Sequence, residues 1–194
     1  GSRGIGAALA HEYSAKGAQV IVTARSGEDL ERVATEINGV AHVADLSTTE
    51  TVDNLIQEIE SLYGPIDVLV NNAGVETVNP VATVATEDIR TAARINLETP
   101  MVLTRQVLPG MIERERGALV YLSSLAGTSG FAGMGPYCAT KAGLNNFVAA
   151  LRIELKNTPI HATLVAPGPV DTRMWDAVET ASESIQRSVQ RFEN

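Results

Sequence analysis

Residues 47–74 read STTETVDNLIQEIESLYGPIDVLVNNAG, and this stretch decides the fold class. Its first half carries apolar residues at helical spacing, namely Val52, Leu55, Ile56, Ile59 and Leu62. The Gly-Pro pair at 64–65 ends the predicted helix, and Ser47 and Glu50 have the spacing of a capping box at its start. The apolar run 66–70 then predicts a buried strand. A helix that leads directly into such a strand is typical of parallel α/β folds.

The same alternation continues along the rest of the chain. Apolar runs that predict buried strands cover 19–24, 40–44, 66–70, 118–122 and 161–166. Helical patterns lie between them, over 29–37, over a long stretch from Thr86, and over 137–156. Since no linker, repeat or low-complexity segment interrupts the pattern, the sequence predicts one domain over residues 1–194. The predicted fold class is α/β, a doubly wound parallel sheet or Rossmann fold.

Composition excludes several classes of partner. The net charge is −8 and there is no run of Lys or Arg, which argues against nucleic acid and anionic membranes. No apolar run reaches the roughly 18–20 residues that span a bilayer. Cys138 is the only cysteine, so an internal disulfide is impossible, and a reducing, cytoplasmic location is expected. The three histidines are scattered without metal-ligand spacing, so we expect no metal site.

A glycine-rich turn at residues 1–6 opens directly into a helical pattern. The free amides at a helix N-terminus can bind a pyrophosphate, although such turns also serve packing alone. The turn resembles the end of the glycine motif of the short-chain dehydrogenase/reductase family. The resemblance implies that the cofactor contacts Ser2, Arg3, Gly4, Ile5 and Gly6.

The same resemblance predicts that the chain is truncated at both ends. The family's motif begins with Thr-Gly after a first, central strand, and neither precedes Gly1 in this sequence. The family also adds a substrate loop and usually one more strand after the position of Val170. We therefore expect the first strand and the C-terminal strand to be absent from residues 1–194. A fragment that lacks its central strand could be inert, because that strand is hydrogen-bonded on both sides.

The end of the second predicted strand indicates the dinucleotide. A ribose 2′-hydroxyl is usually bound by an acidic residue at this point, whereas a 2′-phosphate needs a cation. Here Ala24 offers no carboxylate, and Arg25 and Arg3 offer guanidinium groups that suit a phosphate. The sequence favours NADP(H) over NAD(H). The alternative is that Arg25 pairs with Glu28 or Asp29.

Two further elements follow predicted strands. Asp45-Leu46 resembles the adenine-contacting pair of the family. Asn71-Asn72-Ala73-Gly74 resembles its Asn-Asn-Ala-Gly element, which implies cofactor contacts for Asn72, Ala73 and Gly74. Asx-Gly runs also end strands simply by turning the chain. The ligand-binding edge of a parallel sheet lies at the carboxyl ends of its strands, where this tetrapeptide falls.

The candidate catalytic residues are Ser124, Tyr137, Lys141 and Asn96. Residues four apart share a helix face, so we expect the Lys141 ammonium to lie near the Tyr137 phenol and favour phenolate. As a bare pattern this spacing is usually an exposed pair. The resemblance implies that Tyr137 and Lys141 also contact the cofactor, that Ser124 polarises the substrate oxygen, and that Asn96 supports a proton relay. Spacing favours Ser124 over its neighbour Ser123.

The segment after the last predicted strand resembles the family's nicotinamide-contacting Pro-Gly segment. The implied contacts are Pro167, Gly168, Val170 and Thr172. A plain Pro-Gly turn is the alternative. In this family substrate selection comes from the loop after Thr172 and from the surface near 76–84. Met174 and Trp175 suggest an apolar wall there, but they could equally pack in the core.

Together these motifs predict an NADP-dependent short-chain dehydrogenase/reductase, similar to the 3-oxoacyl-(acyl-carrier-protein) reductase branch. It would transfer a hydride between NADP(H) and an alcohol or carbonyl carbon of a small or acyl-type substrate. The resemblance implies a homodimer or homotetramer, paired through the long helices over 87–115 and 137–156. The alternative is a regulatory or scaffold protein that binds the dinucleotide without turnover, since fold alone does not prove chemistry.

Overall fold

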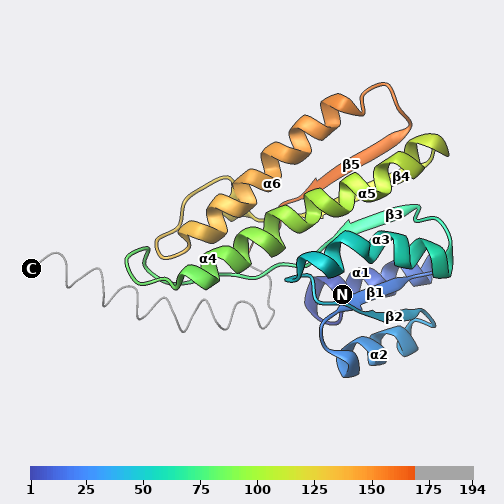
Figure 1. The fold of residues 1–194 in the computed structure, drawn as a ribbon, viewed down its shortest axis with the longest axis horizontal. Coiled ribbons are helices and arrows are strands. Elements are labelled where there is room, and N and C mark those ends of the chain that lie inside the picture. Colours follow the sequence, from blue (N-terminus) through green and yellow to red (C-terminus); the bar gives the residue numbers. More distant parts are fainter. Residues whose placement is uncertain (169–194) are drawn as a thin grey trace, which may run out of the picture. The chain divides into compact units, whose positions relative to one another are not determined.

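A computed structural model describes residues 1–168 of the 194-residue chain. The chain divides into two compact units, one over Gly1–Gly64 and one that begins at Pro65 (Figure 1). The first unit has a two-stranded parallel sheet, and the second has a three-stranded one. Each unit is described separately below.

The first unit alternates helices and strands. Its elements are α1 (Gly4–Ala15), β1 (Ile21–Ala24), α2 (Gly27–Glu36), β2 (Val40–Val43) and α3 (Thr49–Tyr63). β1 and β2 pair in parallel, with Ile21 opposite Val40 and Ala24 opposite Val43. A parallel pair needs a crossover, and α2 supplies it.

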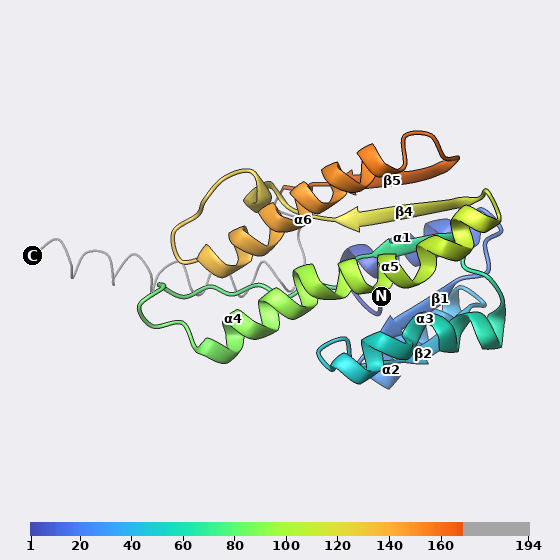
Figure 2. The ribbon, with the colours of Figure 1, turned by 45° about the horizontal axis from the view of Figure 1, so that its top comes forward.

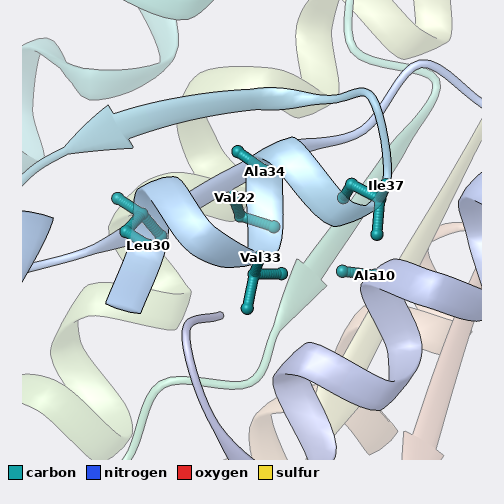
Figure 3. Packing of buried hydrophobic residues seen from close by; sticks show 6 residues of the cluster. All are labelled: Ala10, Val22, Leu30, Val33, Ala34 and Ile37. Carbon is teal, nitrogen blue, oxygen red and sulfur yellow. The ribbon is translucent and has the colours of Figure 1, made fainter. Parts of the chain in front are cut away.

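A small apolar core joins α1, β1 and α2. Its buried residues are Ala10, Val22, Leu30, Val33, Ala34 and Ile37 (Figure 3). Four of them, Leu30, Val33, Ala34 and Ile37, lie at helical spacing within the pattern that the sequence shows over 29–37. Gly39 lets the chain return tightly from α2 into β2, because a Cβ there would lie 2.5 Å from the Val20 carbonyl oxygen. Only glycine fits that approach.

The second unit carries the longer elements. They are β3 (Val68–Asn71), α4 (Thr86–Ala93), the π-helical turn η1 (Arg94–Glu98), α5 (Thr99–Glu113), β4 (Gly117–Leu122), the 3₁₀ turn η2 (Leu125–Gly127), α6 (Gly135–Glu154) and β5 (Ile160–Val165). The strands pair in parallel in the order β3-β4-β5, and Figure 2 shows them side by side. α5 contacts β3 and β4, and α6 contacts β5.

The core of the second unit centres on β4. Leu119 and Tyr121 of this strand are fully buried. The Tyr121 hydroxyl lies 2.7 Å from Thr104 Oγ1, which satisfies its polar end, and its ring meets Phe147 of α6 edge to face at 6.1 Å. β4 is therefore covered by side chains from both α5 and α6.

The predicted α/β fold with parallel strands is confirmed, and one local prediction was wrong. α3 begins after Thr48 as the N-cap residue, and within the described chain no side chain caps it. The Ser47 hydroxyl instead donates to Asp45 Oδ1 at 2.7 Å, and the Ser47 amide donates to the same oxygen at 2.9 Å. The Ser47 hydroxyl, which a capping box would use to cap α3, is thus hydrogen-bonded to the Asp45 carboxylate. The extent of the domain and its truncation stay predictions.

Candidate active site

Tyr137 and Lys141 project from the first turns of α6. Pro136 lies in the first turn of this helix, where its fixed φ suits a helix start. Both side chains are buried, with 8% and 4% of their surface exposed. The Lys141 Nζ lies 5.7 Å from the centre of the Tyr137 ring. The predicted sharing of one helix face is observed, and the pair is not an exposed one.

The Lys141 ammonium is fixed to β4. Its Nζ donates to the carbonyl oxygen of Leu122, the last residue of that strand, at 2.8 Å. Burial disfavours the charged form and lowers the pKa of Lys141 to about 8. A buried lysine with this pKa can both hold and release a proton near neutral pH.

The Tyr137 phenol differs from the prediction in its ionisation. Burial raises the pKa of Tyr137, a hydrogen bond with the Ser124 side chain partly offsets this, and the nearby Glu76 charge adds to the rise. The expected shift towards phenolate by Lys141 is absent. The physical reason is that burial disfavours both charged forms, while the ammonium is bonded to the Leu122 carbonyl. In this state the phenol keeps its proton.

Ser124 and Ser123 have different roles in the strand-to-helix loop. Ser124 has an extended backbone, and its Oγ accepts a hydrogen bond from the Ala126 amide at 3.2 Å. Its side chain also acts on the Tyr137 phenol. Ser123 is buried, and its hydroxyl donates to Asn145 Oδ1 at 2.5 Å. The Ser123 hydroxyl is thus bonded to Asn145, and the catalytic role of Ser124 stays a prediction.

Asn96 is fully buried in the π-helical turn η1. Its Oδ1 accepts from the Val75 amide and its Nδ2 donates to the Val75 carbonyl, both at 2.8 Å. The Nδ2 also donates to Thr140 Oγ1 at 3.1 Å. The side chain therefore ties the helix before α5 to the segment after Gly74 and to α6. Its role in a proton relay stays a prediction.

Gly74 is where Asn96 and Lys141 converge. A Cβ at this position would lie 3.3 Å from Asn96 Oδ1 and 3.6 Å from Lys141 Nζ. Asn71, at the end of β3, is buried, and among residues 1–168 its Nδ2 has no hydrogen-bond partner. The Asn72 amide donates to the Val70 carbonyl at 3.1 Å, which turns the chain out of the strand. The Asn-Asn-Ala-Gly element thus makes a turn and also borders the buried side chains of Asn96 and Lys141.

The Pro-Gly segment after β5 contacts the same loop. The Leu125 amide donates to the Pro167 carbonyl at 3.2 Å, and a Cβ on Gly168 would lie 3.5 Å from the Leu125 side chain. The predicted contacts Val170 and Thr172 lie outside the described residues, as do Met174 and Trp175.

The glycine turn of the first unit begins α1. Arg3 is the N-cap residue, with an extended backbone, and Gly4 has a φ of +51°, which glycine adopts without strain. In the described part of the chain no side chain caps this helix, so the amides of Gly4, Ile5 and Gly6 are free to bind an anion. Ser2 lies directly before this turn.

Charged side chains flank this turn within the first unit. Arg3 forms an ion pair with Asp29 of α2, and its Nε donates to Asp29 Oδ2 at 2.5 Å. Arg25 makes no ion pair with any residue of 1–168, so the alternative pairing with Glu28 or Asp29 is not observed. The hydrogen bonds from Ser47 and the Arg25 charge lower the pKa of Asp45. The donor set of two arginines and free helix amides fits a phosphorylated dinucleotide.

Two site features were missed by the sequence reasoning. Thr140 accepts from Asn96 and donates to the Tyr137 carbonyl at 2.8 Å. Asn145 contacts the loop that carries Ser124. The signal for Asn145 was present, because it lies one helical turn after Lys141 on the same face.

Neither a metal centre nor a membrane span is found in residues 1–168. No three of their His, Cys, Asp and Glu side chains group as metal ligands would. None of their helices is both long and apolar enough to cross a bilayer.

Comparison with known proteins identifies relatives along most of the chain. The family model described as short chain dehydrogenase matches residues 1–183. Ketoacyl reductase HetN of Nostoc sp. is 35% identical over 97% of this chain and 69% of its own length. The 3-oxoacyl-[acyl-carrier-protein] reductase FabG of Haemophilus influenzae is 33% identical, over 91% of this chain and 74% of its own.

A similar solved structure is that of a single-residue variant of actinorhodin polyketide ketoreductase with NADPH. It superposes with a TM-score of 0.87 and 33% identity, covering 92% of this chain and 71% of its own. The chain thus spans about seven-tenths of the length of these relatives.

Proposed function

This chain belongs to the short-chain dehydrogenase family, and on that premise we propose that it is an NADP(H)-dependent reductase of 3-oxoacyl-type carbonyls. The observation that carries this proposal is the buried Tyr137 and Lys141 pair beside Ser124 at the end of β4. Relatives named ketoacyl reductase, 3-oxoacyl-[acyl-carrier-protein] reductase and polyketide ketoreductase support the substrate class.

Tyr137 acts as the general acid in this proposal. Burial keeps its phenol protonated, so the hydroxyl can donate to the carbonyl oxygen of a substrate as the alcohol forms. The Ser124 hydroxyl donates a second hydrogen bond to that oxygen and stabilises the negative charge that develops on it. When bound, NADPH supplies the hydride. The protonated tyrosine is the form that reduction requires as its acid.

Lys141 restores the proton that Tyr137 gives up. With a pKa of about 8, its ammonium can release a proton at neutral pH at modest cost. Its bond to the Leu122 carbonyl holds Nζ one helical turn from the tyrosine. Gly74 borders the same ammonium group, since a Cβ there would lie 3.6 Å from Lys141 Nζ and 3.3 Å from Asn96 Oδ1.

The cofactor contacts follow from the donor sets of the two units. In the first unit the amides that start α1 would hold the pyrophosphate, and Arg3 with Arg25 would hold the 2′-phosphate. Asp45 and Leu46 would contact the adenine. In the second unit Gly74 would contact the cofactor, and Gly168 would border its nicotinamide, as the family resemblance implies. We also propose the cytoplasmic location and the homodimer or homotetramer.

The test is reduction of a short 3-oxoacyl thioester by the full-length protein with NADPH. We expect turnover by the native protein. In Tyr137→Phe we expect kcat to fall by about 10²–10⁴-fold with the Kd for NADPH unchanged, because phenylalanine keeps the shape and removes the acid.

An unchanged rate in Tyr137→Phe would refute the assignment of the acid. Binding of NADPH without turnover of any carbonyl substrate would favour the alternative, a dinucleotide-binding protein without catalysis.

A further inference from the structure

The loop between β4 and α6 carries Ser124, and Asn145 reaches across it. Asn145 lies one helical turn after Lys141 and two turns after Tyr137 on α6. Its Oδ1 accepts from the Ser123 hydroxyl at 2.5 Å, and its Nδ2 donates to the Gly127 carbonyl at 3.0 Å. The side-chain amide of Asn145 therefore hydrogen-bonds to the loop on both sides of Ser124.

The loop lies directly on the helix at Gly127. A Cβ at this position would lie 2.6 Å from Asn145 Nδ2 and 2.9 Å from the Lys141 carbonyl oxygen. These distances are shorter than any side chain allows, so glycine is required. Beside this contact, Ala126 packs with Tyr137 and Cys138 in a small buried cluster.

Ser124 has few restraints of its own. Its hydroxyl accepts from the Ala126 amide at 3.2 Å, which is a local bond within the turn. The neighbours on both sides are held more firmly, because Ser123 is buried and its amide also donates to the Val165 carbonyl at 2.8 Å. The position of the Ser124 hydroxyl relative to α6 therefore depends on the residues around it.

We propose that Asn145 is a positioning residue that holds the Ser124 loop against α6 and sets the position of the Ser124 hydroxyl relative to the Tyr137 phenol. The inference rests on the proposed function, since this geometry matters to a reaction in which both hydroxyls meet one substrate oxygen. The hydrogen bonds of Asn145 within residues 1–168 reach neither the Ser124 hydroxyl nor the Tyr137 hydroxyl. It acts through Ser123 and Gly127.

The consequence of losing Asn145 is specific. The loop would keep its backbone bonds to Val165 and Pro167, so the fold would persist. The Ser124 hydroxyl would move relative to the phenol, and displacements of about 1 Å are enough to lower rates strongly. Ser124 lowers the pKa of Tyr137, so a looser contact would raise that pKa further.

The experiment compares Asn145→Ala with Asn146→Ala in the full-length protein. Asn146 is the adjacent residue of the same type and is exposed on the same helix, so it is a matched control. With a 3-oxoacyl thioester and NADPH, we expect kcat of Asn145→Ala to fall roughly 10-fold. The KM for NADPH should not change, and the alkaline limb of the kcat profile should move to higher pH. Asn146→Ala should match the native protein in all three.

Ser123→Ala is the second variant and tests the same link from the loop side. It removes one hydroxyl and leaves α6 intact, so it remains informative if Asn145→Ala does not fold. We expect a smaller loss of kcat than in Asn145→Ala. The double variant should be no worse than Asn145→Ala alone, because both substitutions break one connection.

The inference is overturned if Asn145→Ala or Ser123→Ala lowers the melting temperature while kcat and the pH profile stay native. Equal losses of kcat in Asn145→Ala and Asn146→Ala would overturn it as well. Failure of the proposed function looks different, because the native protein itself would then show no turnover with NADPH.

Discussion

The candidate site residues of the two units differ in their exposure to water. In the first unit the charged groups suited to a phosphate lie at the surface, with the Arg3 side chain 55% exposed. In the second unit the groups suited to proton transfer are buried, and Asn96 is completely so. A phosphate is itself charged and hydrated, so exposed cations recognise it. Proton transfer needs shifted pKa values, and burial provides them.

The same contrast in exposure predicts different contributions to the free energy of unfolding from the two units. Exposed ion pairs contribute about 0–1 kcal/mol and are screened by salt. A buried hydrogen-bonding group whose partner is removed costs about 1–3 kcal/mol. Substitutions in the second unit should therefore affect folding and pH dependence, and those in the first unit should affect mainly cofactor choice.

The largest effect is expected for Asn96→Ala. It would remove three hydrogen bonds and leave the partly buried amide and carbonyl of Val75 without Asn96 as their partner. We expect the free energy of unfolding to fall by about 3 kcal/mol in a chemical denaturation measurement. Asn54→Ala is the matched control, since Asn54 is exposed and donates one bond to the Glu50 carbonyl. Its expected loss is below about 0.5 kcal/mol, and equal losses would remove the contrast.

The next effect is a pH dependence caused by Lys141. Its pKa is about 8 in the folded protein and near 10.5 when unfolded, so the unfolded state binds more protons between these values. The free energy of unfolding should therefore rise with pH through this window, by about 2 kcal/mol from pH 8 to 9.5. Denaturation of native protein and Lys141→Met across this range measures it. The same rise in both proteins would assign it to another group.

The smallest effect is expected for Asp29→Asn in the first unit. It would release Arg3 from its ion pair, so the guanidinium could bind a 2′-phosphate without competition. We expect the Kd for NADPH to fall about 3-fold and the Kd for NADH to stay the same or rise. Calorimetric titration of both cofactors measures this. Glu28→Gln is the control, since it removes a neighbouring carboxylate, and an identical change there would attribute the gain to net charge alone.

The features predicted from the sequence are those with a short-range signal. Helical spacing identified the face of Leu30, Val33, Ala34 and Ile37, and apolar runs identified the five parallel strands. The spacing of Tyr137 and Lys141 likewise indicated their shared face. Such patterns survive in sequence because neighbouring residues decide them.

The features that escaped prediction depend on contacts between distant segments. Ser47 had the right spacing for a cap, but the Asp45 carboxylate bound its hydroxyl. The sequence offered Arg25 as an ion-pair partner of Asp29, but Asp29 pairs with Arg3, 26 residues away in sequence. The raised pKa of Tyr137 follows from burial, which a helical spacing of four residues cannot report.

The π-helical turn at Arg94–Glu98 has a consequence for how this helix tolerates change in length. Such a turn holds one residue more than an α-helical turn, so it acts as an insertion already absorbed by the helix. Deleting one residue there would restore regular hydrogen bonding and leave the helix on either side close to its present phase, because a π-helical turn and an α-helical turn each complete one rotation about the axis. The completely buried Ala92 would keep its place in the core, whereas Asn96, inside the turn, would lose its register with Val75. The extra residue therefore serves the hydrogen bonds of Asn96 and not the packing of α4.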